Sequence, residues 1–472
     1  MHKSLRVIPI AAAPAIAPAD RIQVRSVSGF FSRWRWAMVW ATQLVFYGLP
    51  WLQMHGRQAV LFDLQARRFH LFGAVLLPQD LIFLTGLLIF SALLLFLATV
   101  VAGRVWCGFA CPQTVYTEMF MWIERRLEGN RASRIRLDQS PWRGSKLVRR
   151  GSKHLAWALL SLWTGLSLVG WFTPIYDLVA ALPALSFGPW EAFWILFYGG
   201  VTYVHAGLLR EKICQHACPY GRFQSSLLDR HTLVVAYDSA RGEPRGARAR
   251  GQQASALSQG DCVDCTLCVQ VCPTGIDIRH GLQAACISCG LCIDACDAVM
   301  DKLRAPRGLI GFSPLEPAAV APGWLAPLRR GRVRFYALAL LGLALLMTVG
   351  WWERPTLRVN ALRDRGVLAR HLHAGRVENV YRLQIMNASE HPHQLALAVQ
   401  ADSGSAPVRL HLVHEGPVQL EGAGAVNVAV SVQMDAEDAQ RLQGTVLPIR
   451  FMVMPNGTDH QAASADSTFL VR

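Results

Sequence analysis

Eight cysteines with one repeated spacing lie between residues 262 and 296 and form the strongest chemical signal in the sequence. Each half of the set has the spacing Cys-x2-Cys-x2-Cys-x3-Cys, which turns three sulfurs toward one small volume. Thiolate sulfur is the soft ligand that iron–sulfur clusters require, and the fourth cysteine of such a run ligates the cluster of the other run. We therefore predict two 4Fe–4S clusters, the first bound by Cys262, Cys265, Cys268 and Cys296 and the second by Cys286, Cys289, Cys292 and Cys272.

A pair of structural zinc sites is the alternative for these cysteines. The cysteine pairs of zinc sites are usually separated by about 12 or more residues, whereas neighbouring cysteines within each run here are three or four positions apart. The spacing is that of bacterial ferredoxins. Asp297 stands where the second run usually has proline, which weakens one turn and removes no ligand. The chain is therefore expected to transfer single electrons.

Four further cysteines form two matched pairs, each with the spacing Cys-x3-Cys-Pro. The pairs are Cys107 with Cys111, before Pro112, and Cys214 with Cys218, before Pro219. Proline favours the first turn of a helix, so each pair is expected where one helix ends and a surface helix begins. If the two halves around them are related by pseudo-symmetry, the four sulfurs converge at the membrane boundary, below the cluster module.

Four convergent cysteines are candidates to bind a soft metal such as Cu(I), to relay electrons, or to contact a quinone headgroup. The alternative is that small cysteines simply pack at the ends of helices, but two pairs at equivalent places make that interpretation weaker. His205 lies within an apolar segment and is a further functional candidate, because polar side chains at membrane depth are costly.

The elements that must position these residues are predicted to be membrane helices. Hydrophobic residues make up 52% of the 472 residues, and a membrane-spanning helix needs about 20 of them in sequence. Five segments qualify: 36–54, 81–102, 155–173, 192–209 and 334–352. Residues 105–123 are not counted, because Pro112 and Glu118 interrupt them.

Charge orients these helices. The net charge of +15 is concentrated in alternate connections: six Lys and Arg precede the first helix, eleven lie in 104–153 and sixteen in 210–334. The connection 55–80 has only three and 174–191 has none. Because Lys- and Arg-rich connections stay in the cytoplasm, the N-terminus and clusters are expected there and the C-terminus in the periplasm. The basic balance is a topology signal, and nucleic-acid binding is not expected.

The last 120 residues have a different pattern. Alternating apolar positions such as Tyr381, Leu383 and Ile385 predict short strands separated by turns, which is typical of an immunoglobulin-like sandwich. All twelve cysteines precede residue 297, as expected if clusters assemble in a reducing compartment and the tail is exported.

The sequence thus predicts a multi-domain membrane protein: a five-helix α-helical membrane unit, a cytoplasmic bacterial-type dicluster ferredoxin module and a C-terminal all-β immunoglobulin-like sandwich. The expected parts are an N-terminal arm (1–35), a four-span unit with both Cys-x3-Cys-Pro motifs (36–230), a flexible linker (239–260), the cluster module (261–300), a fifth transmembrane helix (334–352) and the periplasmic domain (353–472).

This ordered combination resembles one family. Five spans, two Cys-x3-Cys-Pro motifs, a dicluster module and a tail with the stretch Asn379-Val-Tyr381-Arg-Leu383-Gln-Ile385-Met-Asn387 are similar to the cytochrome c oxidase accessory proteins called CcoG, FixG or RdxA. The resemblance covers the chain from about residue 30 onward. It implies an inner-membrane cupric reductase that supplies Cu(I) to the copper site of a cbb-type oxidase. Oxidase assembly factors or copper chaperones are then the expected partners.

Two other functions stay open. A quinol dehydrogenase subunit similar to NapH shares both kinds of cysteine motif, although such proteins generally end soon after their clusters. A non-enzymatic assembly scaffold would use the tail for docking. The electron donor, a quinol or a soluble reductant, is not evident from the sequence, because no dinucleotide-binding fingerprint is present. Whether the chain forms a homodimer also stays open.

Overall fold

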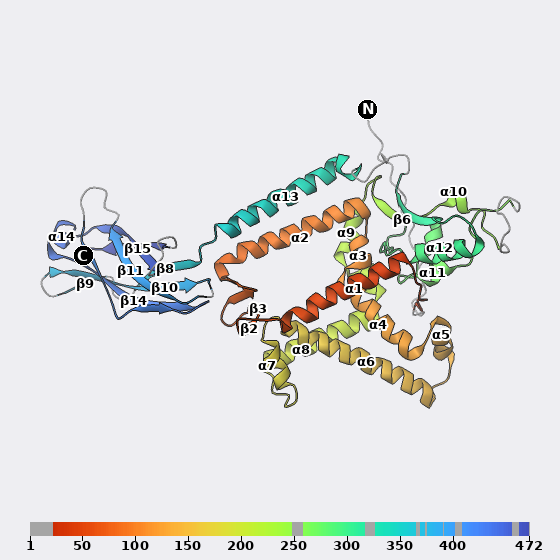
Figure 1. Ribbon diagram of the computed structural model, residues 1–472, viewed down its shortest axis with the longest axis horizontal. Coiled ribbons are helices and arrows are strands. Elements are labelled where there is room, and N and C mark those ends of the chain that lie inside the picture. The colour runs from red at the N-terminus through yellow and green to blue at the C-terminus, as the bar shows by residue number, and fades with distance from the viewer. Residues whose placement is uncertain are drawn as a thin grey trace. The chain divides into compact units, whose positions relative to one another are not determined.

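The computed structural model describes residues 22–247, 258–316, 326–364, 369–372, 375–389, 391–401, 408–455 and 462–471. These residues form two compact units (Figure 1). The first unit contains residues up to 51 together with 85–345, and the second contains 52–84 together with 346–472. Residues 1–21 of the expected arm and 248–257 of the expected linker lie outside the described residues.

Three helices of the described chain are long and apolar enough to cross a membrane. They are α2 (Leu81–Ala102), α8 (Pro189–Thr202) continued by the π-helical segment η3 (Tyr203–Leu209), and α13 (Gly331–Trp352). Their apolar side chains are widely exposed, as for Ile82 (73%) and Leu338 (67%), which suits a lipid environment. The predictions for 81–102, 192–209 and 334–352 agree with these helices.

The other two expected spans are helical but begin earlier than predicted. The helix α1 (Phe30–Gly48) starts six residues before 36 and is followed by η1 (Leu49–Trp51), and α6 (Gly144–Val169) starts eleven residues before 155. Both helices begin in charged sequence, where hydropathy marks the start of the apolar stretch and not that of the helix. Neither helix meets the length and composition expected of a membrane span.

The α6 helix nevertheless packs very closely against α8. A Cβ atom added at Gly165 would lie 3.1 Å from the backbone nitrogen of Gly199 and would clash with the carbonyl oxygen of Ile195. Such backbone-to-backbone packing through small residues is typical of helices in membranes. The short helix α7 (Ile175–Ala181) closes the end of this pair and packs in the same small core.

The first Cys-x3-Cys-Pro motif lies at a helix break, as expected. Its cysteines lie in α3 (Val105–Phe109) and at the N-cap of α4 (Pro112–Glu128), whose first residue is the proline. The expectation of a surface helix after the motif is wrong for α4. Its residue Phe120 is fully buried against Trp157 of α6, and seven of its residues are buried in all. The helix α5 (Arg131–Gln139) follows.

The second motif lies between the π-helical segment η4 (Ile213–Ala217) and the helix α9 (Pro219–Phe223), which again begins with the proline of the motif and leads into η5 (Gln224–Ser226). Thus each motif ends one helical segment and starts another, which confirms the expectation drawn from the prolines.

The cluster module is larger than the predicted 261–300. Two antiparallel strands, β6 (Leu233–Tyr237) and β7 (Ile310–Pro314), pair on either side of it in sequence. They enclose α10 (Ser239–Gly242), α11 (Leu267–Gln270), η7 (Ile278–His280) and α12 (Leu291–Leu303).

Residues 239–247 are not part of a flexible linker, which corrects the predicted boundary. Arg241 forms an ion pair of 2.6 Å with Asp261, and the backbone nitrogen of Gly246 donates to the carbonyl oxygen of Cys262. The Gly- and Arg-rich composition did not reveal these contacts, because they join residues inside the expected linker to residues just after its end.

The second unit begins with small sheets that the sequence did not predict, and their first strand takes residues 53 and 54, which were expected to end the first span. Strands β1 (Gln53–Met54) and β2 (Arg57–Gln58) pair, and β3 (Val60–Asp63), β4 (Arg68–Leu71) and β5 (Ala74–Leu76) form a three-stranded sheet. The 3₁₀ turn η2 (Pro78–Asp80) then leads into α2. Asp80 is buried in ion pairs with Arg354 and Arg358, and Leu77 packs with Met386.

The rest of the second unit is the predicted sandwich. One sheet has the order β12 (Leu410–His414), β14 (Ala425–Met434), β10 (Val377–Asn387) and β8 (Leu357–Arg363), with β9 (Arg370–His371) beside β10. The other has the order β13 (Val418–Leu420), β11 (His393–Ala401), β15 (Val446–Pro455) and β16 (Ala463–Leu470), and α14 (Ala436–Arg441) joins β14 to β15. Inward residues of both sheets form one core, in which Tyr381 is buried and its hydroxyl donates to the carbonyl oxygen of Thr468 at 2.9 Å.

Candidate metal centres

The two cysteine runs have the same backbone conformation. The residues before and after the second cysteine of each run are left-handed: Asp264 (φ 51°) and Thr266 (φ 55°) in the first, Ser288 (φ 52°) and Gly290 (φ 73°) in the second. This conformation is unfavourable for residues other than glycine. Its recurrence at equivalent places indicates that the loops are wound to direct their sulfurs inward.

Each run contributes to a cavity lined by the cysteines that the sequence assigned to one cluster. One cavity is lined by Cys262, Cys265, Cys268 and Cys296, and the other by Cys272, Cys286, Cys289 and Cys292 together with Cys268. The fourth cysteine of each run therefore lies with the first three of the other, as the ferredoxin pattern requires.

These cavities fit clusters better than single ions. No group of three or more His, Cys, Asp or Glu side chains in the described parts of the chain is drawn together as ligands of one ion would be. A cubane cluster is larger than a single ion, so its four ligands must surround a cavity. Four thiols around each cavity, with apolar residues such as Ile287 and Ile310 between them, supply that space and a donor set suited to iron.

The helix α12 explains the missing proline of the second run. It carries Cys292 and Cys296 and continues without a break to Leu303, so Asp297 lies inside a helix. A proline there would remove a helical hydrogen bond. The Asp297 carboxylate instead accepts a hydrogen bond of 3.0 Å from the backbone nitrogen of Gly308. The hydrogen bond of Asp297 thus ties α12 to the loop before β7.

The four cysteines of the Cys-x3-Cys-Pro motifs are neighbours in the first unit, although no three of them are drawn together as the ligands of one ion would be. Burial raises the pKa of Cys107 to about 12, and the neighbouring thiols of Cys111, Cys214 and Cys218 add to that effect. The pKa of Cys214 is raised to about 11, again by burial first and then by Cys111 and Cys218. Ionisation of one of these thiols is therefore disfavoured by the others, and all four are only partly exposed.

The first motif contacts the loop of the second cluster site directly. A Cβ atom added at Gly108 would lie 2.7 Å from the carbonyl oxygen of Ile287 and 2.9 Å from the Cα atom of Cys289. Cys107 packs in the same apolar cluster as Cys289 and Cys292. The absence of a side chain at Gly108 is what allows this close approach.

The second motif touches the same site from another direction. The side-chain amide of Gln215 donates to the carbonyl oxygen of Thr274 at 3.4 Å, and the Thr274 hydroxyl lies 3.3 Å from the sulfur of Cys272. Both motifs therefore contact the loops that carry the cysteines predicted to bind the second cluster.

Buried ion pairs hold the chain just before the second motif. Arg210, which has a left-handed backbone (φ 42°), donates to Glu124 of α4 at 2.8 Å. Glu124 is completely buried and also accepts from Arg134 at 3.2 Å, while Lys153 of α6 pairs with Glu128 at 2.7 Å. This network fixes Arg210, four residues before Cys214, against α4 and α6.

The helix α1 is anchored on the cluster module. The Asp294 carboxylate, between two cluster cysteines in α12, accepts hydrogen bonds from the backbone nitrogens of Phe31 (3.1 Å) and Ser32 (2.7 Å). These are unpaired N–H groups of the first helical turn, where a negative charge is favourable. Farther along α1, the buried Arg35 pairs with Glu118 of α4 at 3.1 Å.

Models of three protein families match the chain. Residues 209–314 match a 4Fe–4S dicluster domain, residues 84–130 match a 4Fe-4S binding domain, and residues 347–472 match the immunoglobulin-like fold at the C-terminus of FixG, described as a putative oxidoreductase. Protein RdxA of Cereibacter sphaeroides is 38% identical over 94% of this chain and 92% of its own length.

The chain belongs to the FixG/RdxA family. The nitrogen fixation protein FixG of Rhizobium meliloti is 37% identical over 82% of the chain and 80% of its own length. The ferredoxin-type protein NapH of Haemophilus influenzae is less similar, with 28% identity over 39% of the chain. This member of the family is thus an iron–sulfur electron-transfer protein associated with a membrane.

One residue that helps to organise the site of this family member was not evident in its sequence. Gln113, two positions after Cys111, donates to the carbonyl oxygens of His205 (3.0 Å) and Arg210 (3.1 Å). It joins α4 to the π-helical segment that precedes the second motif. His205 takes part in this contact through its backbone carbonyl oxygen. Polar residues near a motif are too common for the sequence to single out Gln113.

Proposed function

We propose that the chain is an inner-membrane cupric reductase that reduces Cu(II) to Cu(I) and supports assembly of the copper site of a cbb-type cytochrome c oxidase. The observation that carries this proposal is the contact between Gly108 and the backbone of Cys289, which joins the four-cysteine site to a cluster site. Thiol sulfur favours Cu(I), whereas Cu(II) prefers nitrogen and oxygen ligands.

The clusters, once assembled, supply single electrons. Each Cu(II) ion takes one electron and becomes Cu(I), and a donor outside the chain, either a quinol or a soluble reductant, must replace that electron. Cys107, Cys111, Cys214 and Cys218 are proposed to take the reduced ion as it forms. Because burial raises the pKa of Cys107, Cys111 and Cys214, binding of Cu(I) to their sulfurs would release protons.

The proposed function also includes five membrane crossings. If only α2, α8–η3 and α13 crossed, the two Cys-x3-Cys-Pro motifs would lie on opposite sides of the membrane. Their mutual effect on thiol pKa values, and the contact of each with the second cluster site, support a single side. An even number of crossings between Cys111 and Cys214 requires that α6 cross as well as α8.

The second unit supports α1 as a crossing in the same way. Residues 52–80 lie in one unit with the C-terminal domain, where Asp80 pairs with Arg354 and Arg358. The start of α1 is held instead by Asp294 of the cluster module. If α1 crosses the membrane, its start can lie on the side of the cluster module, and the residues after it can lie on the side of the C-terminal domain.

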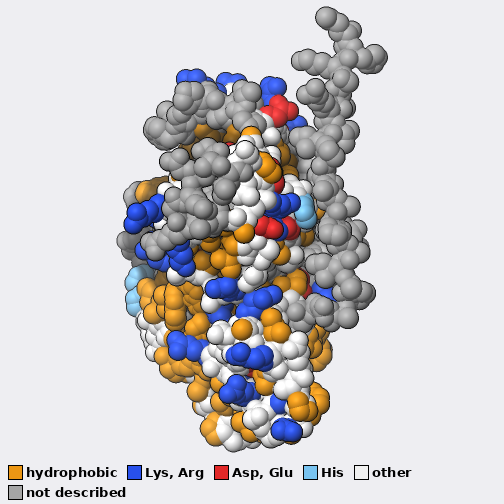
Figure 2. All heavy atoms as spheres, turned by 90° about the vertical axis from the view of Figure 1, so that its right-hand side faces the viewer, with side chains coloured by type: hydrophobic (Ala, Val, Ile, Leu, Met, Phe, Trp, Pro, Cys, Tyr) orange, Lys and Arg blue, Asp and Glu red, His pale blue; other side chains and the backbone are white. Residues whose placement is uncertain are grey.

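Charge supports the cytoplasm as the side of the clusters. Figure 2 looks onto the end of the molecule that carries the cluster module and the α4–α6 connection, and Lys and Arg recur over this face while Asp and Glu are few. The positive-inside rule assigns such surfaces to the cytoplasm. The immunoglobulin-like domain would then be periplasmic, where oxidase assembly factors or copper chaperones could reach it.

The test is EPR spectroscopy of anaerobically purified, prereduced protein titrated with Cu(II). We expect the cupric signal to disappear as the clusters are oxidised, one ion per electron. The variant Cys107→Ala/Cys214→Ala should keep about eight irons per chain and reduce Cu(II) at least tenfold more slowly. Ser161→Ala/Ser167→Ala, which truncates two buried side chains of α6, is the control for disturbance of the helices.

Two results would contradict the proposal. A double-cysteine variant as fast as the wild type would exclude these cysteines from copper reduction. An iron content of about twelve per chain would instead mean that the four cysteines bind a third cluster, in agreement with the 4Fe–4S description of the model that matches residues 84–130. The NapH-like alternative is favoured if quinol reduces the clusters and copper does not oxidise them.

A further inference from the structure

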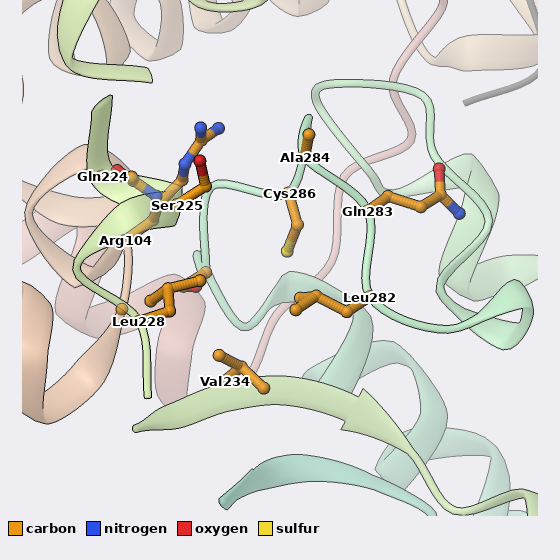
Figure 3. Close-up of a pocket in the computed structure, with 11 residues that line it drawn as sticks. Arg104, Gln224, Ser225, Leu228, Val234, Leu282, Gln283, Ala284 and Cys286 are labelled. Atoms are coloured by element: carbon orange, nitrogen blue, oxygen red, sulfur yellow. The ribbon is translucent and has the colours of Figure 1, made fainter. Parts of the chain in front are cut away.

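A pocket beside the second cluster site has a single charged side chain in its wall. It is lined by Arg104, Gln224, Gln283, Cys286 and Ser288, with Gly103, Ser225, Ala284 and apolar residues completing the wall. Arg104 and Cys286 come from facing walls of the pocket (Figure 3). Arg104 and Cys286, a predicted ligand of the second cluster, therefore line one pocket.

The fold fixes Arg104 in this position. Gly103 ends α2 with a left-handed backbone (φ 57°), and a Cβ atom there would lie 3.2 Å from the carbonyl oxygen of Leu233 in β6. Glycine is the residue best suited to such a turn. The Arg104 guanidinium then donates to the carbonyl oxygen of Gly221, in the helix that follows the second Cys-x3-Cys-Pro motif.

Arg104 is a buried cation without a carboxylate partner. Only 8% of the residue is exposed, and none of the ion pairs formed among the described residues includes it. Arg104 lines the same pocket as Cys286, and its backbone carbonyl oxygen accepts a hydrogen bond of 3.0 Å from the backbone nitrogen of Gly108, the residue after Cys107. It thus lies between the second cluster site and the first Cys-x3-Cys-Pro motif.

The arginines near the first cluster site are neutralised. Arg279, in the wall of that cavity, pairs with Asp277 at 2.6 Å and also with Asp264. Arg241, on the same side of the module, pairs with Asp261. Asp297 adds a negative charge directly after Cys296. The arginines named here thus have carboxylate partners, whereas no printed ion pair of the described residues includes Arg104.

We propose that Arg104 holds the reduction potential of the second cluster above that of the first, so that electrons entering through the first cluster collect beside the four cysteines. Reduction adds one negative charge to a cluster, and net charge, hydrogen bonding and solvent exposure set its potential. A cation that no carboxylate neutralises favours the reduced form, and a buried one is screened least.

Burial lowers the expected reduction potential of the second cluster, whereas the charge of Arg104 raises it. Cys289 of the second site is buried, whereas Cys265 of the first is exposed. Burial alone disfavours the extra negative charge and would place the second cluster below the first. Without Arg104, electrons would then rest on the cluster farther from the four cysteines. The use of this ordering rests on the proposed function, but the ordering itself does not.

The experiment is an EPR-monitored redox titration of the full-length protein, with Cys265→Ser and Cys289→Ser used to assign each signal to a cluster. In the wild type we expect the second cluster to be reduced at the higher potential. In Arg104→Gln its ratio of reduced to oxidised form at fixed potential should fall at least tenfold, about 59 mV for one electron. Arg104→Lys should keep most of the wild-type ratio. Arg307→Gln, which removes an exposed arginine paired with Asp301 in the same module, is the charge control and should change neither ratio.

A wild-type titration in which the second cluster is reduced at the lower potential would overturn the inference even if no Arg104 variant can be purified. Equal shifts of both clusters in Arg104→Gln, or no shift, would also overturn it. If the potentials are ordered as expected but Cu(II) does not oxidise the protein, the inference stands and the proposed copper function fails.

Discussion

At the scale of single residues, the contact between the two kinds of cysteine site depends on one missing side chain. We expect Gly108→Ala to push the backbone of Ile287 and Cys289 away, because the new Cβ atom would lie 2.7 Å and 2.9 Å from their atoms and backbone cannot rotate aside. The second cluster should be lost, so that iron falls from about eight to about four per chain. Iron and acid-labile sulfide analysis measures this loss.

The control for this substitution is Gly200→Ala in α8, where an added Cβ atom meets nothing within 4 Å. It should retain both clusters. Full iron content in Gly108→Ala would show that the motif and the cluster loop can separate without consequence, and it would remove the main support for electron transfer between them.

The cysteines were predictable because their spacing along the sequence indicates cluster binding. The sequence predicts that Cys296 joins the first run and Cys272 the second, since the ferredoxin rule exchanges the fourth cysteine, and each lines the corresponding cavity. Gly108 and Arg104 were not identified. Their importance comes from residues more than 170 positions away, Cys289 and Cys286, and no periodic pattern records such a contact.

At the scale of elements, the cluster module and the first helix are joined by one carboxylate. We expect Asp294→Asn to weaken the anchoring of α1 by about 1–3 kcal/mol, because two hydrogen bonds to a charged acceptor and a favourable helix-dipole contact are lost. Amide hydrogen exchange of the first turn of α1 should speed up accordingly. Both clusters should remain, since Asp294 is not a cluster ligand.

Asp301→Asn, on the same helix but solvent-exposed and paired only with Arg307, is the matched control and should leave exchange in α1 unchanged. Equal exchange rates in both variants would mean that the apolar contact of Phe31 with the module, and not the Asp294 carboxylate, holds α1.

The buried network behind the second motif should be much more sensitive to substitution. Glu124→Gln leaves Arg134 and Arg210 buried with a neutral partner, and breaking such a pair typically costs about 3–5 kcal/mol. Asp138→Asn removes a partly exposed partner of Arg150 and should cost at most about 1 kcal/mol. Thermal denaturation in detergent compares the two variants. Similar melting temperatures would mean that the network does not stabilise the fold.

Element boundaries were predictable only where hydropathy and helix ends coincide. The bounds of α2 match the predicted 81–102, because Gly103 ends both the apolar run and the helix. The starts of α1 and α6 were missed, since charged residues such as Arg35 and Lys153 continue these helices and are paired inside the protein. The π-helical segments η3 and η4 had no signal in sequence, yet they flank Arg210, as irregular helices often do at functional sites.

At the scale of the whole molecule, the contacts within each unit predict how the chain passes through the membrane. With five crossings, residues 52–80 and the tail lie in the periplasm, whereas both Cys-x3-Cys-Pro motifs and the clusters lie in the cytoplasm. Three crossings would instead place residues 103–188 and 210–330 on opposite sides. Single cysteines introduced at exposed positions distinguish the two arrangements.

We expect a membrane-impermeant maleimide to label Gln65→Cys and Val446→Cys in intact cells whose outer membrane has been permeabilised, and Trp142→Cys only after the inner membrane is opened. All three positions are exposed and lie outside the cysteine motifs. Trp142 precedes α6 and Val446 follows α13, so these two positions lie on opposite sides of the membrane only if α6 crosses it as well as α8 and α13. Labelling of Trp142→Cys in intact cells, together with protection of Gln65→Cys, would favour three crossings. The four-cysteine site could then not form within one chain, because Cys107 and Cys214 would be separated by the bilayer.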